Sequence, residues 1–570
     1  MACAVLTLVA VFPTVRHDTV AAARARCEML VLRDREASSM PASAETLDDP
    51  GAEAGARAAP TEIELKLVVP AARLAEIACA PVIERHARNA GTVRRLNSVY
   101  YDTPDRSLWE AGFTLRVRSK GSACTMTVKS TAPVNGGLLG RSEWEAPVPD
   151  MQPRIEVLAP HLPKAFFAAL GAAPLEPMFS TEVRRRTRKL DLPDAVIELA
   201  VDEGRVVAGA ASEPICELEF ELESGAASAL YDLALGLLDH GPAELSVHSK
   251  AARGFDLALG RPPAYAKAKK SALRGRVVLD DVFAAMLVDA LLHFVRNKPA
   301  AVDGRHPEGV HQLRVALRRM RAILKLLGKL TDSSEAGAFA DEARWLASAH
   351  GDAREWDVFL AETVPPVASA CPEIAGFAVL QAAAERLRAE GYDKARAALA
   401  DRRAQRFQLL LARWIECRGW RAELSDKARA ALAAPATDHA LAVLTRQHRK
   451  VLAKGRHFDR LEPEARHELR LAVKKLRYVT DFLLPLCARG KRAKRYAKTL
   501  SALQDGLGRY NDVAVTAALL DRLAVPETPA AGHEACGAIR GWQARDLADL
   551  EAGLRALWDA FRAAGRPWTG

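Results

Sequence analysis

The spacing of apolar residues changes once along this chain of 570 residues, from every second position to every third or fourth. Up to about residue 260, segments such as CELEFELE alternate apolar and polar residues, as a half-buried strand does. From about residue 273, segments such as DDVFAAMLVDALLHFV have the period of a helix. Two prolines and a lysine cluster in GRPPAYAKAKKS separate the two parts. The chain therefore predicts an α+β protein with a strand-rich domain over 61–260, a linker over 261–272 and an all-α domain over 273–560.

The two ends of the chain differ in composition from both domains. Residues 1–60, rich in Ala, Gly, Pro and Asp, predict a disordered leader, and 561–570 a short tail. The apolar stretch at the start lacks a basic region before it and a small-residue cleavage site after it, which argues against secretion. No apolar run approaches the ~18 residues that cross a bilayer, and the nine cysteines include no C-x-x-C pair. We expect a cytoplasmic protein with reduced thiols and no membrane partner.

The formal net charge of +10 favours a polyanionic partner. We do not expect that partner to be nucleic acid, because the basic segments lack the interleaved aromatic residues of single-strand binders.

Charged residues line one face of each strand-like segment in the first domain. In EIELK, Glu62, Glu64 and Lys66 point to one side and the apolar residues to the other. The same alternation gives five further polar faces: Arg116 and Arg118; Thr125, Thr127 and Lys129; Glu143 and Glu145; Glu198 and Asp202; and Glu217, Glu219, Glu221 and Glu223. One such strand is most often half-buried with a solvated face. Six of them, carrying both acids and bases, predict a closed barrel of about eight antiparallel strands with a charged lumen.

A lumen of this kind suits a chain of phosphates together with divalent cations. Paired carboxylates are hard oxygen ligands for Mg²⁺ or Mn²⁺, and guanidinium and ammonium groups neutralise phosphate oxygens. The chain has no G-x-S-x-G, H-E-x-x-H or Walker A motif, which fits attack by a water molecule that a metal ion activates.

These charged segments resemble a known family. EIELK resembles the E-x-E-x-K signature of the CYTH, or triphosphate tunnel metalloenzyme, domain, and YYDTPDRSLWEAGFTLRVR, TVK, ICELEFEL and SKAARG resemble its later segments in order. The resemblance implies an eight-stranded antiparallel β tunnel with flanking helices over residues 61–260. It assigns the metal, Mg²⁺ or Mn²⁺, to Glu62, Glu64, Asp202, Glu217, Glu219 and Glu221. It assigns the triphosphate to Lys66, Arg116, Arg118, Lys129, Arg141, Arg185 and Lys250, with Arg184 and Arg186 as alternatives to Arg185.

The activity that this resemblance implies is that of an inorganic triphosphatase, which hydrolyses tripolyphosphate to pyrophosphate and phosphate. Two other interpretations stay open. A CYTH-type adenylate cyclase would use the same tunnel on ATP. A polyphosphate-granule binding protein would have no significant catalysis.

The second domain contains an internal repeat. VHQLRVALRRMRAIL resembles RHELRLAVKKLRYVT, and GDAREWDVFL resembles DGLGRYNDVAV. The matching residues are His311 and His467, 156 positions apart, Arg354 and Arg509, 155 apart, and Asp357 and Asp512, 155 apart. Two independent blocks at one spacing predict a duplicated helical bundle. We expect Arg354 with Asp357, and Arg509 with Asp512, to form internal ion pairs.

A basic stripe occurs in both repeats. Residues spaced i, i+3, i+7 and i+10 share one face of a helix, and this spacing relates His311, Arg314, Arg318 and Arg321 in one repeat and His467, Arg470, Lys474 and Arg477 in the other. A lone basic helix is more often a solvated face, but stacked like charges repel unless a polyanion neutralises them. These segments resemble the CHAD domain, a helical domain commonly fused behind CYTH domains. That resemblance implies that the stripes bind inorganic polyphosphate, and association with polyphosphate granules is a further expectation.

Overall fold

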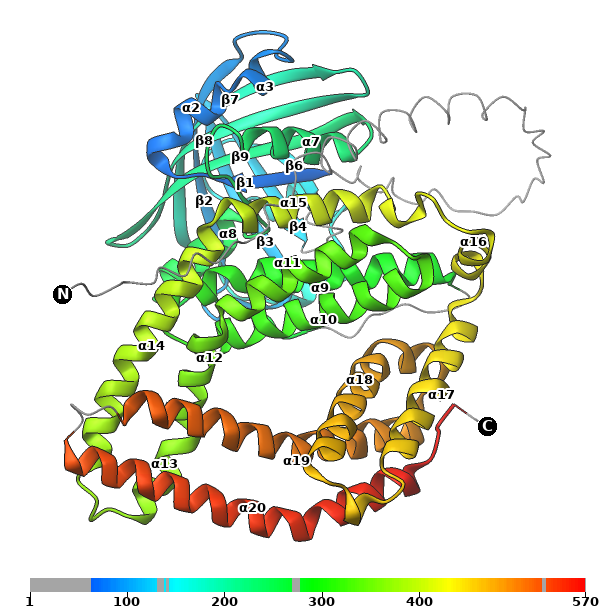
Figure 1. The fold of residues 1–570 in the computed structure, drawn as a ribbon. Helices are drawn as coiled ribbons and strands as arrows, with labels where there is room; N and C mark the ends of the chain where they lie inside the picture. The colour runs from blue at the N-terminus through cyan, green and yellow to red at the C-terminus, as the bar shows by residue number, and fades with distance from the viewer. Residues whose placement is uncertain (1–62, 131–137, 140–142, 269–276, 525–528, 569–570) are drawn as a thin grey trace, which may run out of the picture. The chain divides into compact units, whose positions relative to one another are not determined.

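The computed structural model describes residues 63–130, 138–139, 143–268, 277–524 and 529–568 (Figure 1). The predicted leader, the metal candidate Glu62, the phosphate candidate Arg141 and the end of the predicted linker lie outside these residues.

The described part of the first domain forms one antiparallel sheet of ten strands. The strands are β1 (Glu64–Val68), β2 (Thr92–Asp102), β3 (Phe113–Lys120), β4 (Ala123–Ser130), β5 (Leu138–Leu139), β6 (Glu143–Val148), β7 (Glu176–Leu192), β8 (Ala195–Ala208), β9 (Ala211–Gly225) and β10 (Glu244–Ser246). Eight of them follow one another in space as β1-β9-β8-β7-β2-β3-β4-β6, and β10 and β5 both pair with β1. Because β5 directly precedes β6 in the chain, its pairing with β1 brings the two ends of the sheet together.

Short helices cover the apolar outer face of this sheet. They are η1 (Ala71–Arg73), α2 (Leu74–Ala78), α3 (Pro81–Glu84), α4 (Ser107–Glu110), α5 (Ile155–Leu158), α6 (Lys164–Leu170) and α7 (Ser228–Leu237). Leu65, Leu199 and Phe220 from three adjacent strands are fully buried in one cluster with residues of α2 and α7. The apolar half of each alternating strand is thus directed outward onto helices, and the charged half is directed inward.

A further helix, α8 (Lys250–Ala258), packs against the inward face of the sheet. Its Phe255 lies in a buried cluster with Tyr100 and Phe179, which share a strand face with the charged residues. Gly254 permits this approach, because a Cβ there would lie 2.0 Å from the Phe179 ring. The inward face is therefore apolar where α8 packs and charged beyond it.

The second domain is entirely helical in its described residues. Its helices are α9 (Leu279–Asp303), α10 (Glu308–Thr331), α11 (Ser334–Ala349), α12 (Gly351–Val358), the π-helix η2 (Phe359–Thr363), α13 (Val364–Ala370), α14 (Gly376–Ala400), α15 (Arg402–Glu416), η3 (Gly419–Arg421), α16 (Asp426–Ala433), α17 (Ala436–Lys454), η4 (Phe458–Arg460), α18 (Pro463–Cys487), α19 (Gly490–Leu523) and α20 (Ala530–Ala564). None of the helices in the described ranges is long and apolar enough to cross a membrane.

The internal repeat is visible in where these helices begin. The starts of α9, α10, α11 and α14 recur as the starts of α17, α18, α19 and α20, 154 to 157 residues later. The repeats are not identical, because the first is divided at His350 into α11 and α12 where the second continues as the single helix α19. In addition, α15 and α16 follow α14 and have no counterpart after α20 in the described residues. The predicted α+β class, with an antiparallel sheet followed by a duplicated helical domain, is confirmed.

Candidate active site

Three neighbouring strands bring the charged residues of the sequence into parallel rows. β9 lies between β1 and β8, so each inward residue of β9 has a partner on one or both sides. In order along β9, the pairs are Glu221 with Glu64 and Glu198, Glu219 with Lys66, and Glu217 with Asp202.

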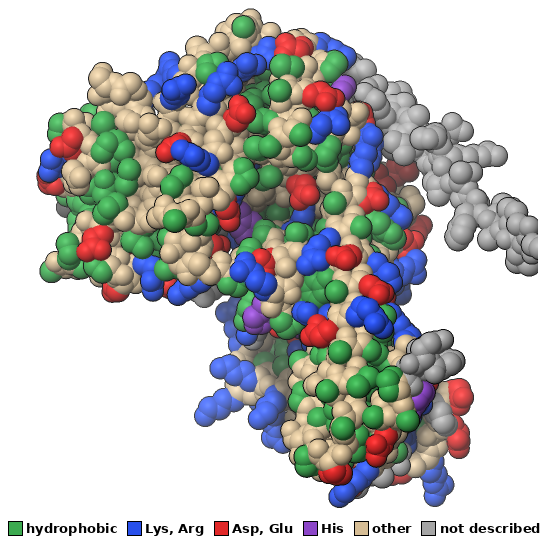
Figure 2. All heavy atoms as spheres, turned by 90° about the vertical axis from the view of Figure 1, so that its left-hand side faces the viewer, with side chains coloured by type: hydrophobic (Ala, Val, Ile, Leu, Met, Phe, Trp, Pro, Cys, Tyr) green, Lys and Arg blue, Asp and Glu red, His purple; other side chains and the backbone are tan. Residues whose placement is uncertain are grey.

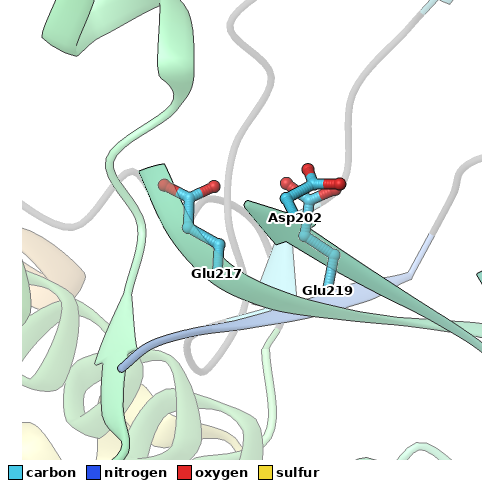
Figure 3. Close-up of side chains that lie close together, drawn as sticks. All are labelled: Asp202, Glu217 and Glu219. Atoms are coloured by element: carbon cyan, nitrogen blue, oxygen red, sulfur yellow. The ribbon is translucent and has the colours of Figure 1, made fainter. Parts of the chain in front are cut away.

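Three of these carboxylates form a compact acidic triad. One oxygen from each of Asp202, Glu217 and Glu219 lies within 4.8 Å of the others (Figure 3). Asp202 and Glu217 are fully buried, and the Glu219 side chain is 18% exposed. Three hard oxygen donors at this spacing fit a divalent cation such as Mg²⁺ or Mn²⁺.

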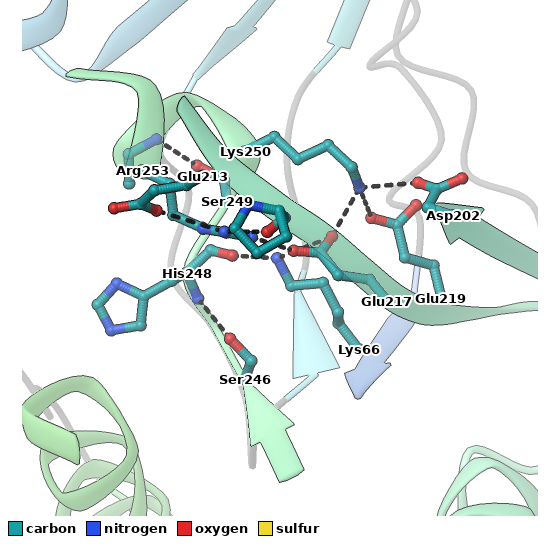
Figure 4. Close-up of polar contacts among 12 residues, drawn as sticks. Lys66, Asp202, Glu213, Glu217, Glu219, Ser246, His248, Ser249, Lys250 and Arg253 are labelled. Carbon is teal, nitrogen blue, oxygen red and sulfur yellow. Dashed lines mark hydrogen bonds and ion pairs between the residues drawn. The ribbon is translucent and has the colours of Figure 1, made fainter. Parts of the chain in front are cut away.

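The ammonium of Lys250 lies among all three carboxylates of this triad (Figure 4). Its Nζ is 2.7 Å from an oxygen of Glu217, 2.7 Å from one of Glu219 and 2.8 Å from one of Asp202. Arg185 donates to both oxygens of Asp202, at 2.7 and 2.6 Å, and to Glu219. Glu217 has two further cationic partners, with a nitrogen of Arg253 at 3.2 Å and that of Lys66 at 3.9 Å. Four cations therefore surround three largely buried negative charges.

The electrostatic balance at the triad favours the charged forms of Lys250 and Glu219. Burial alone would lower the pKa of Lys250, but Glu217, Glu219 and Asp202 outweigh it and raise that pKa well above its ordinary value. Burial would likewise raise the pKa of Glu219, but Lys250 and Arg185 hold it well below its ordinary range. Lys66 is different, because burial dominates and lowers its pKa; its ammonium donates to the His248 carbonyl (Figure 4).

A second set of charges comes from strands β3, β4 and β6. Lys129 forms an ion pair with Glu143, and an Arg116 nitrogen lies 3.7 Å from the same carboxylate. Arg118 donates to the Ser98 hydroxyl at 3.1 Å, and burial, with Arg116 nearby, lowers its pKa to about 10.

Residues of both sets line one pocket of about 270 Å³ in the described structure, and Asp202 and Glu217 lie outside its lining. Its lining includes six cationic and six acidic side chains. The cations are Lys66, Arg116, Arg118, Lys129, Arg185 and Lys250, and the acids are Glu64, Glu143, Glu145, Glu198, Glu219 and Glu221. Because positive and negative charges are equal in number, a polyanion that enters this pocket needs additional cations to neutralise it.

The structure brings most of the predicted site residues together. Each of the six predicted phosphate ligands that lie in described ranges lines the pocket, as do the metal candidates Glu64, Glu219 and Glu221. Asp202 and Glu217 contact Lys250 from buried positions beside it. Of the three candidate arginines on β7, Arg185 has the inward position, whereas Arg184 faces outward and lies 3.4 Å from Glu203.

Several lining residues were given no role from the sequence. They are Tyr100, Thr114, Glu143, Glu145, Glu198, Ala200, Ser249 and Ala251. Glu143, Glu145 and Glu198 share the period-two spacing of the residues that were assigned a role. That spacing alone could have identified them as lining residues. Tyr100 is buried, and although burial would raise its pKa, Arg116 and Arg118 lower it.

The two basic stripes of the helical domain lie beside each other on α10 and α18. Burial lowers the pKa of Lys474, and so do Arg318, Arg470, Arg321 and Arg314 around it. The Arg318 guanidinium lies 5.7 Å from the centre of the Tyr478 ring on α18. The stripes thus form one basic surface, which we call the α10–α18 surface, made by Arg314, Arg318, Arg321, Arg470 and Lys474.

The remaining stripe residues lie at the margin of that surface. His311 is half-buried, and burial, followed by Arg354, lowers its pKa. His467 is exposed, and Arg477 donates to Ser501 and Asp481. On the face drawn in Figure 2, Lys and Arg side chains are interspersed with Asp and Glu over the upper part of the molecule, and a group of them without acidic neighbours lies below it.

The predicted partners within the repeated R-x-x-D segments are wrong. Asp357 accepts hydrogen bonds from Arg388 at 2.7 Å and from Tyr392 at 2.9 Å, both on α14. Arg354 lies 3.6 Å from Glu362. Arg509, in the second repeat, lies 3.3 Å from Asp546 on α20. Asp357 and Arg509 do join helices, through partners in distant segments that sequence spacing does not reveal, whereas the partner of Arg354 is eight residues along the chain.

Family models describe the same two parts of the chain. Residues 60–255 match the CYTH domain, and residues 285–521 match the CHAD domain. The chain therefore carries a CYTH domain followed by a CHAD domain.

Three proteins illustrate what the chain is similar to. An inorganic triphosphatase of Haemophilus influenzae is 34% identical over 161 residues, which cover 28% of this chain and 45% of that relative. An uncharacterised protein of Mycobacterium tuberculosis is 27% identical over 508 residues, which cover 83% of this chain and 91% of that protein. The CHAD domain from the plant Ricinus communis has a crystal structure that is 30% identical, with a TM-score of 0.46, and covers 53% of this chain and 98% of its own. The first match therefore spans less than half of the triphosphatase.

Proposed function

We propose that the protein is a metal-dependent inorganic triphosphatase, which hydrolyses tripolyphosphate to pyrophosphate and phosphate. The observation that carries this proposal is the pocket in which six cations and six carboxylates face one another. The cations suit phosphate oxygens, and the carboxylates suit the divalent cations that such a substrate brings or requires. Similarity of the first domain to an inorganic triphosphatase supports the same conclusion.

The acidic triad beside the pocket has the oxygen spacing that fits Mg²⁺ or Mn²⁺. Glu64, Glu221 and Glu198, which are paired across three neighbouring strands, supply further carboxylates to the pocket. A bound divalent cation would supply positive charge that polarises the phosphate oxygens and makes an attacking water more acidic.

The chain's own cations would position the substrate. Arg116, Arg118 and Lys129 project from strands β3 and β4, so they would hold one side of a phosphate chain. Guanidinium groups bind phosphate with two parallel hydrogen bonds, which orients it as well as neutralising it. Phosphoryl transfer depends mainly on such positioning and on stabilising charge on the transferred group.

The composition of the pocket favours an inorganic substrate over ATP. Among its described lining residues, the side chains with apolar surface are Tyr100, Ala200 and Ala251. A nucleobase needs a broader apolar or aromatic wall. This is the observation against the adenylate cyclase alternative.

We further propose that the α10–α18 surface binds inorganic polyphosphate. Lys474 and four arginines gather there, and burial together with these neighbours lowers the pKa of Lys474, so an anion that neutralises the group would stabilise its charged form. A protein that works on soluble and granular polyphosphate would act in the cytoplasm.

Phosphate release from the purified chain tests the enzymatic proposal. We expect Mg²⁺- or Mn²⁺-dependent hydrolysis that EDTA abolishes, with kcat/KM highest for tripolyphosphate, lower for ATP and lowest for pyrophosphate. Cyclic AMP formed from ATP would instead support the cyclase. Tight polyphosphate binding without hydrolysis of any of the three substrates would support the granule-binding alternative.

A further inference from the structure

Lys250 and the acidic triad cannot both perform the roles expected of them in the arrangement that the structure shows. The triad is expected to bind a metal ion and Lys250 to bind the triphosphate. Yet the Lys250 ammonium lies where a cation bound by Asp202, Glu217 and Glu219 would lie (Figure 4). A metal ion cannot enter while the ammonium is there, and the ammonium cannot bind phosphate while three carboxylates hold it.

Carboxylate oxygens surround the ammonium in this position. It donates hydrogen bonds to Glu217 and Glu219, each at 2.7 Å, and an oxygen of Asp202 lies 2.8 Å from Nζ as an ion-pair partner. The Lys250 side chain is 10% exposed. It is therefore an internal cation that keeps the negative charges of the triad from repelling one another.

The backbone and side chain of Lys250 differ in their freedom to move. Its Cα is fixed at the first turn of α8, where the Ser249 hydroxyl accepts a hydrogen bond from the Ala252 N–H. Its four-carbon stem is flexible, and the residue already lines the pocket. Rotation of the stem alone would carry the ammonium from the triad into the pocket, with no movement of the helix.

We propose that a divalent cation displaces the Lys250 ammonium from the acidic triad and releases it into the pocket to bind the triphosphate. Arg185 stays on Asp202 throughout, since its guanidinium holds the oxygens of that carboxylate from the other side. Metal binding thus precedes and prepares substrate binding. This inference rests on the metal dependence in the proposed function and adds an order of events to it.

Charge and distance favour the exchange once metal is present. A divalent ion carries twice the charge of an ammonium, and its oxygen ligands lie at about 2.0–2.1 Å for Mg²⁺. The carboxylate oxygens of the triad therefore have to close in on the ion by about 0.7 Å compared with their distance from Nζ. The displaced ammonium then meets phosphate oxygens, which replace the carboxylates as acceptors.

Manganese binding to the substrate-free chain tests the competition directly. Lys250→Met removes the competing ammonium, and Lys129→Met removes the same charge from the same pocket at a position paired with Glu143 instead. We expect Lys250→Met to raise Mn²⁺ affinity at least about tenfold more than Lys129→Met does, measured by calorimetry, because only the former vacates the triad. Equal effects of the two changes would mean that Lys250 affects Mn²⁺ affinity only through its positive charge, and would overturn the proposal.

The unmodified chain provides a second test, which is independent of any loss of stability in Lys250→Met. An ammonium held by three buried carboxylates reacts slowly with an amine-modifying reagent. Saturating Mg²⁺ without tripolyphosphate should increase the modification of Lys250 several-fold in a mass-spectrometric assay, while Lys129 changes little. Lys250 that stays equally protected with and without metal would contradict the exchange. Neither assay requires turnover, so an inactive protein that shows both effects would refute the triphosphatase and leave this inference standing.

Discussion

Arg185 and Asp202 oppose each other on β7 and β8 and form a two-pronged ion pair, with nitrogen–oxygen distances of 2.7 and 2.6 Å. Asp202 is fully buried, so its charge is costly to keep without partners. Arg185 and Lys250 together supply that compensation, and Glu219 shares both cations. Replacing one of these charged side chains by a neutral one leaves a buried charge without its full set of partners.

Arg185→Lys keeps the charge but loses the fork that reaches both oxygens of Asp202. An ammonium is a point donor and cannot reproduce this geometry. We expect kcat/KM for tripolyphosphate to fall at least about tenfold, because the triad and the cations near it shift. Arg184→Lys is the matched control, since its side chain is 54% exposed on the outer face. If the two variants had equal activity, the two-pronged pair would have no importance for the reaction.

Glu64→Gln tests the metal row on β1. The exchange removes one negative oxygen ligand but keeps the size of the side chain. We expect activity to fall at least about 100-fold, because even changes behind a metal ligand commonly cost 10- to 100-fold. Glu203→Gln, on the outer face of β8 and 62% exposed, should keep its activity. Circular dichroism and melting temperature should be the same for both; most of the activity remaining in folded Glu64→Gln would remove Glu64 from the site.

Buried histidines make the helical domain sensitive to acid. Burial lowers the pKa values of His293, His350 and His448 to about 4, whereas an unfolded histidine titrates near 6.5. The folded chain binds fewer protons than the unfolded one between these values, so stability is complete above pH 6.5 and declines as pH falls towards 4. Each histidine should contribute a loss of about 2 kcal/mol at pH 5.

We therefore expect the melting temperature to fall markedly between pH 7.5 and pH 5. His448→Gln should show a smaller fall, since one group that must be neutral in the fold is gone. His448 is a suitable choice, because its ring forms one hydrogen bond, to Tyr496, that a glutamine can replace. A fall of the same size in the variant would mean that His448 does not titrate as its burial implies.

The alternating pattern predicted which face of each strand is charged, but not which charges meet. Period two places Glu217 and Glu219 inward without reference to any other strand. That Glu217 opposes Asp202, and that Lys250 joins them from a helix 31 residues or more away, depends on strand order and register. These are long-range properties that a local pattern does not contain.

The helical repeat illustrates the same limit. Two blocks at one spacing predicted the duplication, because each repeat is a structural unit whose helices recur together. The partner of Asp357 was predicted wrongly as Arg354, three residues away, when it is Arg388 on another helix. Nearby opposite charges suggest a pair in sequence, but packing decides which cation reaches a buried carboxylate.

Charge reversal on the α10–α18 surface tests polyphosphate binding by the full-length chain. Binding is measured in a Glu64→Gln background, so that the polymer is not hydrolysed. Arg318→Glu and Lys474→Glu should each weaken the binding of long-chain polyphosphate, and the double variant should weaken it at least about tenfold further, because long polyanions gain affinity from the counterions released at each neutralised phosphate. Arg540→Glu, on α20 and paired with Asp521, is the control and should have little effect.

Salt, tripolyphosphate and DNA distinguish this binding from a general attraction between opposite charges. Affinity should fall steeply with added salt, and the double variant should have a shallower salt dependence, by about one unit of log–log slope for each phosphate that the protein no longer neutralises. In chains that retain Glu64, the same changes should leave tripolyphosphate hydrolysis unaltered, because neither Arg318 nor Lys474 lines the pocket in the described structure. Duplex DNA at matched phosphate concentration should bind more weakly, since its phosphates are spaced by sugars and cannot pack as densely against five clustered cations. Equal affinity for both polymers would mean that this surface binds polyanions without specificity. If the chain bound neither polymer, the basic stripes would have only a structural role.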